Sequence, residues 1–565
     1  MISKKTSIAL ISATFLLSLS GCSSKLRPLS GNMVSAEPQP LEVVGNKVPV
    51  KVHVTFPAKY FSKDARLKIV PQMRYASGEK WGPSFTFQGE KVMGNEIVVP
   101  YEQGANRNLD FAIDYDPAML RSELFLTFEA YNGSSKVVLP SLKVADGVIA
   151  TADLASVKDA APAIAPDRFQ RIIKQAFDAN IMFLIQQAQV RAKEVNKEDV
   201  EEWRYIVQNA KETPNQRVSV EVQAYASPDG GKDLNEKLSE ARERNTTKVI
   251  KNQFKKQDLA DVEINAHYTA QDWEGFKKLV ESSNLQDKDL VLRVLEMYPD
   301  PEQREKEIKN ISAVFSQLAD IILPQLRRSR LVANVEIIGK SDDEIKEWAE
   351  KYPGRLSLDE LLYAATLQQT NKEKERLYKI ARQLYPLEYR SYNNLGVLSY
   401  LEGNMVQAEY WFTEANKRKM NPETNLNLGL IALQKGDVKR ANELISTSSN
   451  VPEVGQAMGI IYLNEGQYDK AEVALGDFKN NNAAVAQIMN KDYAKAAATL
   501  NAIAQPNAKT SYLKAVVAAR TNDAAGVYAN LKDAATKDAS LVKRMANDLE
   551  FAAYKNTPEF GSLLR

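Results

Sequence analysis

The stretch YNNLGVLSYLEGNMVQAEYWFTEA, residues 392–415, decides the fold of the C-terminal part of the chain. Within it, small residues stand at Gly396, Gly403 and Ala408. The same three residue types recur after a shift of 33 positions and again after a further 30, at Gly429, Gly436, Ala441, Gly459, Gly466 and Ala471. A period in this range indicates a solenoid of helical hairpins, in which small residues let two helices approach each other and bulky residues fill the neighbouring groove.

The repeated pattern resembles the tetratricopeptide repeat. An earlier copy ends with Tyr378, Ala381 and Pro386, and weaker copies follow around 493–496 and 512–531. The resemblance implies an all-α solenoid of about five or six repeats over residues 356–565. Such a solenoid is expected to bind one or more envelope proteins, and an ordinary helical bundle is the alternative.

The first residues, MISKKTSIALISATFLLSLSGC, have the three-part layout of a secretory signal. The apolar run is about 12 residues long, whereas crossing a bilayer takes roughly 20. Leu19-Ser20-Gly21-Cys22 resembles the lipobox of bacterial lipoproteins. The resemblance implies removal of residues 1–21 and acylation of Cys22, for example with palmitate, so that acyl chains anchor the chain in a bilayer. An ordinary signal peptide with a stray cysteine is the alternative.

Residues 22–40 are rich in Ser, Pro and Gly and predict a lipidated flexible tether. Ser23 and Ser24 are not acidic, and by resemblance to outer-membrane lipoproteins this implies an outer-membrane protein that faces the periplasm. Cys22 is the only cysteine, so no intramolecular disulfide can form. Lys+Arg at 74 and Asp+Glu at 72 nearly balance, which gives no bulk attraction to nucleic acid.

Residues 41–150 predict a β-sandwich of immunoglobulin-like size. Apolar and polar residues alternate over 48–56, and about seven short strand patterns are separated by turn signals such as Asn132-Gly133. Small residues with a proline predict a linker at 151–165. His53 lies on the polar face of its strand, and the chain has only one other histidine, so no metal site is expected.

Residues 166–340 alternate strand and helix patterns, which predicts an α+β module. A strand at 217–225 enters a Gly-rich turn and then a helix. On this helix Asn235, Ser239 and Arg242 share one stripe, whereas the stripe with Leu234 is expected to face the sheet, together with Leu238, Ala241 and Val249. The polar stripe at the helix N-terminus makes a carboxylate site. Alternatively, Arg242 caps a loop and Asn235 only starts the helix.

The pattern Asn235-x-x-Leu238-Ser239-x-x-Arg242 resembles the OmpA-like domain, a periplasmic module that binds peptidoglycan. In that family the helix Arg, here Arg242, takes the carboxylate of diaminopimelate, and an Asp in the preceding turn takes its ammonium. That Asp position falls on Ser227, which carries no charge. Asp229 either substitutes for it or only stabilises the turn.

The chain departs from the OmpA-like family a second time at about 270–324, where extra helix patterns, the last of them at 302–323, precede Arg327-Arg328. These two residues resemble the family's closing arginine pair. Residues 341–355 are expected to link the module to the repeats.

Two scaffold functions are open. His53 and His267 lie in different modules, and the chain has no nucleophile motif, phosphate loop or dinucleotide fingerprint, so neither an enzyme nor a cofactor is expected. The order of modules is similar to that of Bacteroidetes envelope lipoproteins. The first function tethers the outer membrane to peptidoglycan and recruits proteins through the repeats. The alternative is a subunit of an outer-membrane assembly or secretion complex whose OmpA-like domain does not bind peptidoglycan.

Overall fold

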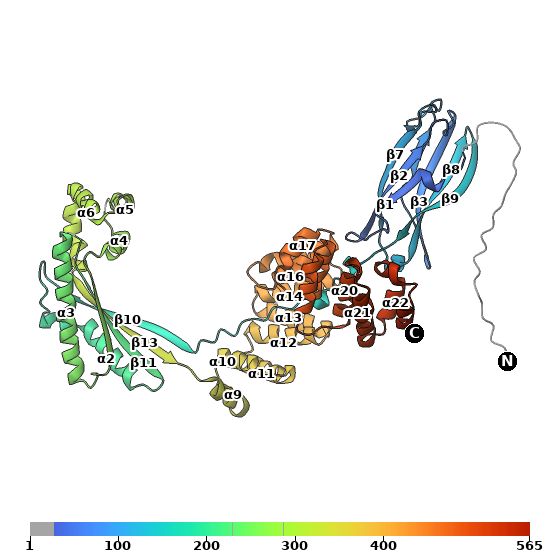
Figure 1. The fold of residues 1–565 in the computed structure, drawn as a ribbon. Helices are drawn as coiled ribbons and strands as arrows, with labels where there is room; N and C mark the ends of the chain where they lie inside the picture. The colour runs from blue at the N-terminus through green and yellow to red at the C-terminus, as the bar shows by residue number, and fades with distance from the viewer. Residues whose placement is uncertain (1–26, 229, 286, 565) are drawn as a thin grey trace. The chain divides into compact units, whose positions relative to one another are not determined.

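A computed structural model describes residues 27–228, 230–285 and 287–564 of the chain. The predicted signal peptide, Cys22 and Asp229 lie outside these residues. The chain divides into two compact units (Figure 1): unit 1 is Met1–Pro166 with Tyr385–Arg565, and unit 2 is Asp167–Leu384. In the described part of the chain, no helix is both long and apolar enough to cross a membrane.

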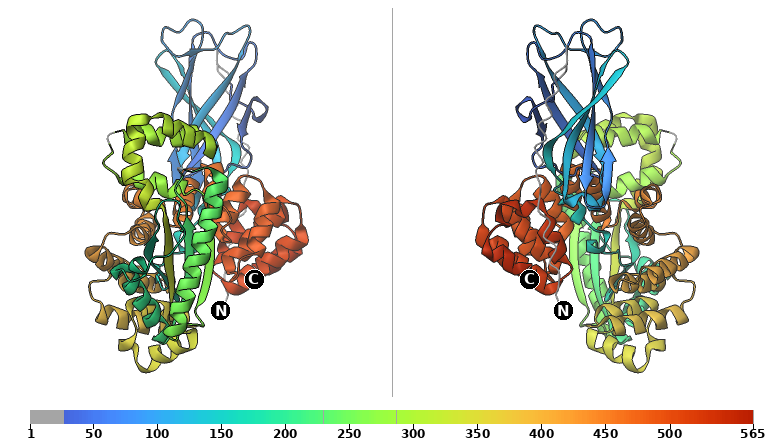
Figure 2. Two further views of the ribbon diagram at one scale, coloured as in Figure 1. Left: turned by 90° about the vertical axis from the view of Figure 1, so that its left-hand side faces the viewer. Right: turned by 90° about the vertical axis from the view of Figure 1, so that its right-hand side faces the viewer.

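The N-terminal region of unit 1 consists of two layers of β-strands (Figure 2). One sheet has the order β1-β2-β7, with β1 at Val34–Glu37, β2 at Lys47–Phe56 and β7 at Ala105–Asp114. The other has the order β6-β5-β3-β8-β9, and β4 pairs with β3. Its strands are β3 (Ala65–Tyr75), β4 (Gly78–Trp81), β5 (Phe85–Gln88), β6 (Ile97–Val98), β8 (Ser122–Asn132) and β9 (Ser135–Gly147).

The β-sheet region begins earlier than its sequence pattern suggests. Residues 22–40 are predicted to be a flexible tether, but β1 pairs antiparallel with β2 from Val34 to Glu37. Val34 and Ala36 are buried in the core shared by the two sheets. These apolar side chains explain why this end of the predicted tether is ordered.

The predicted helical repeats are confirmed: five antiparallel hairpins follow one another in the described residues of unit 1. A Cβ atom at Gly396 would lie 2.5 Å from Phe412, and one at Gly429 would lie 2.7 Å from Ile445. The glycines therefore let the two helices of a hairpin touch. The helices are α12 (Tyr389–Leu401), α13 (Met405–Arg418), α14 (Pro422–Gln434), α15 (Val438–Ile445), α16 (Val454–Asn464), α17 (Tyr468–Leu475), α18 (Asn481–Met489), α19 (Tyr493–Asn501), α20 (Ala508–Arg520) and α21 (Ala524–Lys537).

The turn inside each hairpin requires a left-handed backbone conformation. Gly403, Gly436 and Gly466 have φ values of +78°, +78° and +73° at this position. Lys491 and Asn522 hold the same position in the last two hairpins, with φ values of +64° and +60°. The weaker sequence copies have therefore lost the glycine but kept the turn, at some conformational cost. Helices α22 (Leu541–Asn547) and α23 (Pro558–Leu563) follow the last hairpin.

Unit 2 contains a four-stranded sheet of order β10-β13-β11-β12. Only β11 and β12 are parallel. Helices α2 and α3 cover one face, where Trp203 and Phe254 stack over the buried side chains of the sheet. The elements are β10 (Ile172–Met182), α1 (Ala192–Val195), α2 (Glu198–Glu212), β11 (Gln216–Tyr225), α3 (Lys232–Lys256), β12 (Glu263–Thr269) and β13 (Arg328–Ile338).

The predicted orientation of α3 is wrong. The stripe with Leu234 is expected to face the sheet, but this side chain is 52% exposed. The buried stripe instead begins with Asn235, Ser239 and Arg242 and becomes apolar only at Ile250 and Phe254. Polar residues can occupy the buried face because main-chain groups of neighbouring loops satisfy them.

Five helices between β12 and β13 form a small core of their own around Phe276, Val291 and Leu318. They are α4 (Trp273–Ser282), α5 (Lys288–Met297), α6 (Pro301–Asn310), α7 (Ser312–Ile321) and α8 (Leu323–Leu326). The predicted linker at 341–355 contains helix α9 (Asp342–Lys351), which a capping box between Ser341 and Glu344 opens. The hairpin of α10 (Leu358–Thr366) and α11 (Asn371–Leu384) completes unit 2.

Candidate functional site

Residues 150–165 run along the first helices of the five hairpins in unit 1 (Figure 1). The path is extended except for two 3-10 turns, η3 (Ala152–Leu154) and η4 (Val157–Asp159). We call residues 150–165 the threaded segment. Their composition predicts a linker, but Ala163 is 0% and Ala165 1% exposed. Alanine methyl groups are small enough for the main chain to approach the helices closely. The segment is therefore an occupant of the repeat groove.

Side-chain amides of the helices pair with the main chain of the threaded segment. On α12, Asn394 accepts from the Ala165 N–H at 2.9 Å and donates to the Ala165 carbonyl at 3.1 Å. On α14, Asn427 makes the same pair of hydrogen bonds with Ala163, at 2.7 Å and 2.8 Å. Each asparagine thus satisfies both main-chain groups of one residue.

Two later helices continue this arrangement. On α16, Gln456 accepts from the Ala161 N–H at 3.1 Å. On α18, Asn482 accepts from the Ser156 N–H and donates to the Ser156 carbonyl, both at 2.8 Å. Residues 161, 163 and 165 alternate, as expected because every second residue of an extended chain faces the same side. We call Asn394, Asn427, Gln456 and Asn482 the amide ladder.

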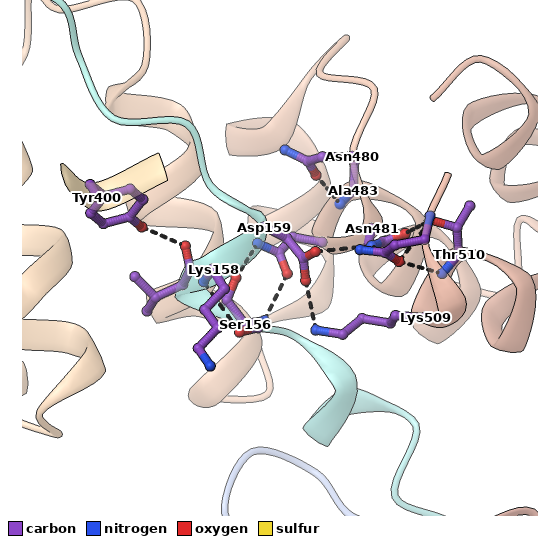
Figure 3. Close-up of polar contacts among 12 residues, drawn as sticks. Ser156, Lys158, Asp159, Tyr400, Asn480, Asn481, Ala483, Lys509 and Thr510 are labelled. Carbon is purple, nitrogen blue, oxygen red and sulfur yellow. Dashed lines mark hydrogen bonds and ion pairs between the residues drawn. The ribbon is translucent and has the colours of Figure 1, made fainter. Parts of the chain in front are cut away.

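One carboxylate of the threaded segment is recognised through its side chain (Figure 3). Asp159 forms a 2.7 Å ion pair with Lys509 of α20 and accepts a 2.9 Å hydrogen bond from Asn481 of α18. Beside it, the Tyr400 hydroxyl donates to the Val157 carbonyl at 2.7 Å. Burial raises the pKa of Tyr400 well above its usual value, and the nearby Asp159 charge adds to this shift. The phenol therefore remains a donor.

The upstream end of the threaded segment is fixed by charged groups. The Thr151 hydroxyl donates to the Glu550 carboxylate at 2.5 Å, and Glu550 pairs with Arg520 at 2.7 Å. Arg544 donates to the Ala150 carbonyl at 2.8 Å. Burial raises the pKa of Glu550, and the Arg520 guanidinium opposes this shift.

Arg242, the predicted carboxylate ligand of unit 2, is fully buried. Its guanidinium donates to the carbonyls of Leu184, Gln187 and Tyr225 at 3.3, 3.0 and 2.8 Å. It also lies 4.9 Å from the centroid of the Phe183 ring. The guanidinium of Arg242 thus joins main-chain segments of the protein through hydrogen bonds.

The other predicted site residues lie close to one another and make similar local contacts. Asn235 donates to the carbonyls of Ser227 and Gly230 at 2.9 and 2.7 Å. The Ser239 hydroxyl donates to the Glu236 carbonyl at 3.0 Å, and the Ser227 hydroxyl accepts from Arg327 at 3.4 Å. The structure thus brings Asn235 and Ser227 together, through a hydrogen bond that closes the turn.

The amide ladder is not among the sites that the sequence predicts. A usable signal was present, because Asn394 and Asn427 are 33 positions apart, like Gly396 and Gly429. The signal weakens after that point, since Gln456 stands one position before the next expected place. Polar residues that repeat with the solenoid period would have indicated a shared ligand.

No protein-family model matches the chain, and no curated protein matches it. Among solved structures, the chain is similar to a tetratricopeptide repeat protein from Parabacteroides merdae, with 16% identity over 40% of this chain and 89% of that chain and a TM-score of 0.27. It is also similar to the APC/C hetero-tetramer Cut9-Hcn1 (15% identity, 65% and 80% covered, TM-score 0.28) and to yeast Tom70 (14% identity, 59% and 77% covered, TM-score 0.25). These TM-scores are low. The description of the repeats therefore rests on the helices and turns of this chain alone.

Proposed function

We propose that the chain is a non-enzymatic outer-membrane lipoprotein, anchored through Cys22, that serves as a protein-binding scaffold in an envelope assembly and does not hold peptidoglycan. The observation that carries the proposal is the amide ladder. Four helices of unit 1 present amides to the main chain of one extended polypeptide. A groove of this kind is suited to polypeptides, and the helical repeats supply it.

The tether to peptidoglycan is the less favoured function because of the position of Arg242. A tether through this residue needs a guanidinium that can meet a carboxylate of the ligand. Arg242 would first have to leave the carbonyls of Leu184, Gln187 and Tyr225. Each buried carbonyl left without a donor costs about 1–3 kcal/mol. We infer that the residues of the OmpA-like pattern stabilise the fold of unit 2 and do not bind a ligand.

Sedimentation with purified peptidoglycan tests the proposal on the full mature chain. We expect the protein to stay in the supernatant. The matched variants are Arg242→Ala and Arg244→Ala, since Arg244 lies on the same helix with an exposed side chain. Pelleting of the wild type would refute the proposal. Its loss in a folded Arg242→Ala variant, but not in Arg244→Ala, would assign the binding to the predicted carboxylate site.

The lipid anchor is tested separately by labelling cells with a palmitate analogue. We expect the wild type and Ser24→Ala to carry the label and to fractionate with the outer membrane. Cys22→Ser should lose the label and be released into the soluble fraction, because a sulfur atom is needed for the thioether. A labelled Cys22→Ser variant would refute the anchor.

A further inference from the structure

The occupant of the groove in unit 1 must pair with the amides that it covers. With the threaded segment in place, Asn427 and Asn482 are both 0% exposed, and Asn394 is 3% exposed. Because the occupant shields these amides from water, an occupant that left one of them unpaired would lose about 1–3 kcal/mol. An extended main chain supplies the required donors and acceptors, one pair for each residue.

Most of the recognition does not depend on the occupant's side chains. The ladder contacts only main-chain atoms of Ser156, Ala161, Ala163 and Ala165. Any residue other than proline offers the same N–H and carbonyl. Small side chains are needed where the helices bury them, at Ala160, Ala163 and Ala165. Many extended segments therefore satisfy the ladder.

One contact adds sequence selectivity. Asp159 meets Lys509 and Asn481, and it stands four positions before Ala163 and six before Ala165. The exposed positions between them, such as Ala161, place no demand on the side chain. The groove therefore selects an acidic residue followed by small residues one, four and six positions later.

The two ends of the threaded segment are held differently. The upstream end is fixed by Glu550 and Arg544. The downstream end is held by Asn394 at Ala165 and by the buried Arg390, which donates to the Pro166 carbonyl at 3.4 Å, and the chain leaves unit 1 after Pro166. Release from the downstream end would break the contacts of Asn394 and then of Asn427 while the upstream anchors remain in place.

From these contacts we propose that the threaded segment is an exchangeable internal ligand. A segment of a partner protein, with an acidic residue followed by small residues one, four and six positions later, replaces it along the amide ladder. The inference rests on the proposed scaffold function and specifies its partner. The chain's own threaded segment occupies the groove until a partner segment displaces it.

The test uses a fluorescent peptide of residues 156–166, SVKDAAPAIAP, and the full mature chain. Ala163→Glu puts a charge at a fully buried position and should expel the chain's own segment. Ile164→Glu is the matched control, because Ile164 is 54% exposed. Fluorescence anisotropy should show saturable binding to Ala163→Glu. Binding to the wild type and to Ile164→Glu should be roughly tenfold weaker or more, because the tethered segment competes at a high effective concentration.

Peptide variants check that the peptide occupies the same groove. An Ala163→Glu peptide should not bind, and an Asp159→Asn peptide should bind roughly tenfold more weakly, since it loses a charge-assisted contact. Adding Asn427→Leu to the Ala163→Glu chain should weaken binding by a similar factor. If neither the two peptide variants nor Asn427→Leu weakened binding, the peptide would bind outside the groove, and the inference would be refuted.

A second variant of the protein provides the test if Ala163→Glu does not fold. A protease site inserted between Pro166 and Asp167 allows the downstream end to be freed without any change to the groove. The cleaved chain should bind the peptide more tightly than the uncleaved chain. If no folded variant and no cleaved chain binds it, the segment is a permanent structural part. Peptidoglycan sedimentation and lipid labelling do not depend on the groove, so they test the lipid anchor and the absence of peptidoglycan binding separately from this inference.

Discussion

Asn427 is the residue on which the central part of the threaded segment depends. It satisfies both main-chain groups of Ala163, and Asn393 donates to the same carbonyl at 3.0 Å. Thr424 and Asn427 in turn donate to Asn393 at 3.0 and 3.1 Å. A connected set of this kind is costly to break because every member is buried.

We expect Asn427→Leu to lower the free energy of unfolding by about 1–3 kcal/mol, since it leaves the Ala163 N–H without an acceptor. Urea denaturation measures the change. Asn442→Leu is the control, because Asn442 is an exposed asparagine on the neighbouring helix α15. Equal effects of the two substitutions would contradict the role of the ladder.

Arg242→Ala should destabilise unit 2 by at least about 2 kcal/mol, because buried carbonyls lose a charged donor. Arg244→Ala should change the free energy of unfolding by less than about 0.5 kcal/mol, since its ion pair with Glu240 is exposed. Tryptophan fluorescence during urea denaturation reports the difference through the buried Trp203. If Arg242→Ala left the free energy of unfolding unchanged, the Arg242 guanidinium would not be holding the loops together.

The shared stripe of Asn235, Ser239 and Arg242 was predictable from helical spacing, but its burial was not. A polar stripe at a helix N-terminus has the same pattern whether it faces a ligand or a loop. The carbonyl partner at Gln187 lies 55 positions upstream of Arg242, and no local signal marks it. The choice between ligand and loop depends on tertiary contacts.

At the scale of the helical hairpin, the glycines of the repeats are sites of contact. Alanine is favoured over glycine in a helix by about 1 kcal/mol. We nevertheless expect Gly396→Ala to be destabilising, because its Cβ would lie 2.5 Å from Phe412. Gly561→Ala on α23 is the control, since no atom lies within 4 Å of its Cβ position. Thermal unfolding that ranks Gly396→Ala as the more stable variant would contradict the packing.

Successive hairpins are also joined through Glu472 of α17. Hydrogen bonds from Asn490 and from Lys495 lower the pKa of this carboxyl below its ordinary value of 4.5. A lowered pKa in the folded state means that the stabilisation is present above pH 4.5 and is lost as the pH falls through the folded value.

Glu472→Gln should therefore reduce the loss of thermal stability below pH 4.5. Glu443→Gln is the control, because its carboxylate is half exposed on the neighbouring hairpin. Melting curves across this pH range measure the effect. An unchanged acid dependence in Glu472→Gln would refute the contribution of Glu472.

Element boundaries were predictable where a repeat or a strong period was present. The pattern over 302–323 predicts one helix, but the structure has α6 and α7, with Ile311 between them at a non-helical ψ of 72°. Neither glycine nor proline stands at this break, so the local sequence gives no signal for it. The turn depends on how the two helices pack into their common core.

At the scale of the whole molecule, unit 2 is an insertion between the threaded segment and the hairpins that bind it. Ala165 and Asn394 are 229 positions apart, and Ser156 and Asn482 are 326 apart. Composition identified residues 151–165 as small and proline-containing, which suits either a linker or a buried segment. The segment is buried because it contacts a groove formed by residues far away in the sequence, and its own composition does not indicate those contacts.

Hydrogen exchange at the main-chain amides of the threaded segment measures whether the groove of unit 1 is occupied. In the intact mature chain, the amides of Ser156, Ala161, Ala163 and Ala165 should exchange slowly, because each donates to a ladder side chain. Asn427→Leu should accelerate exchange at Ala163 first. Exchange of all four amides at the rate of the free peptide would contradict an occupied groove.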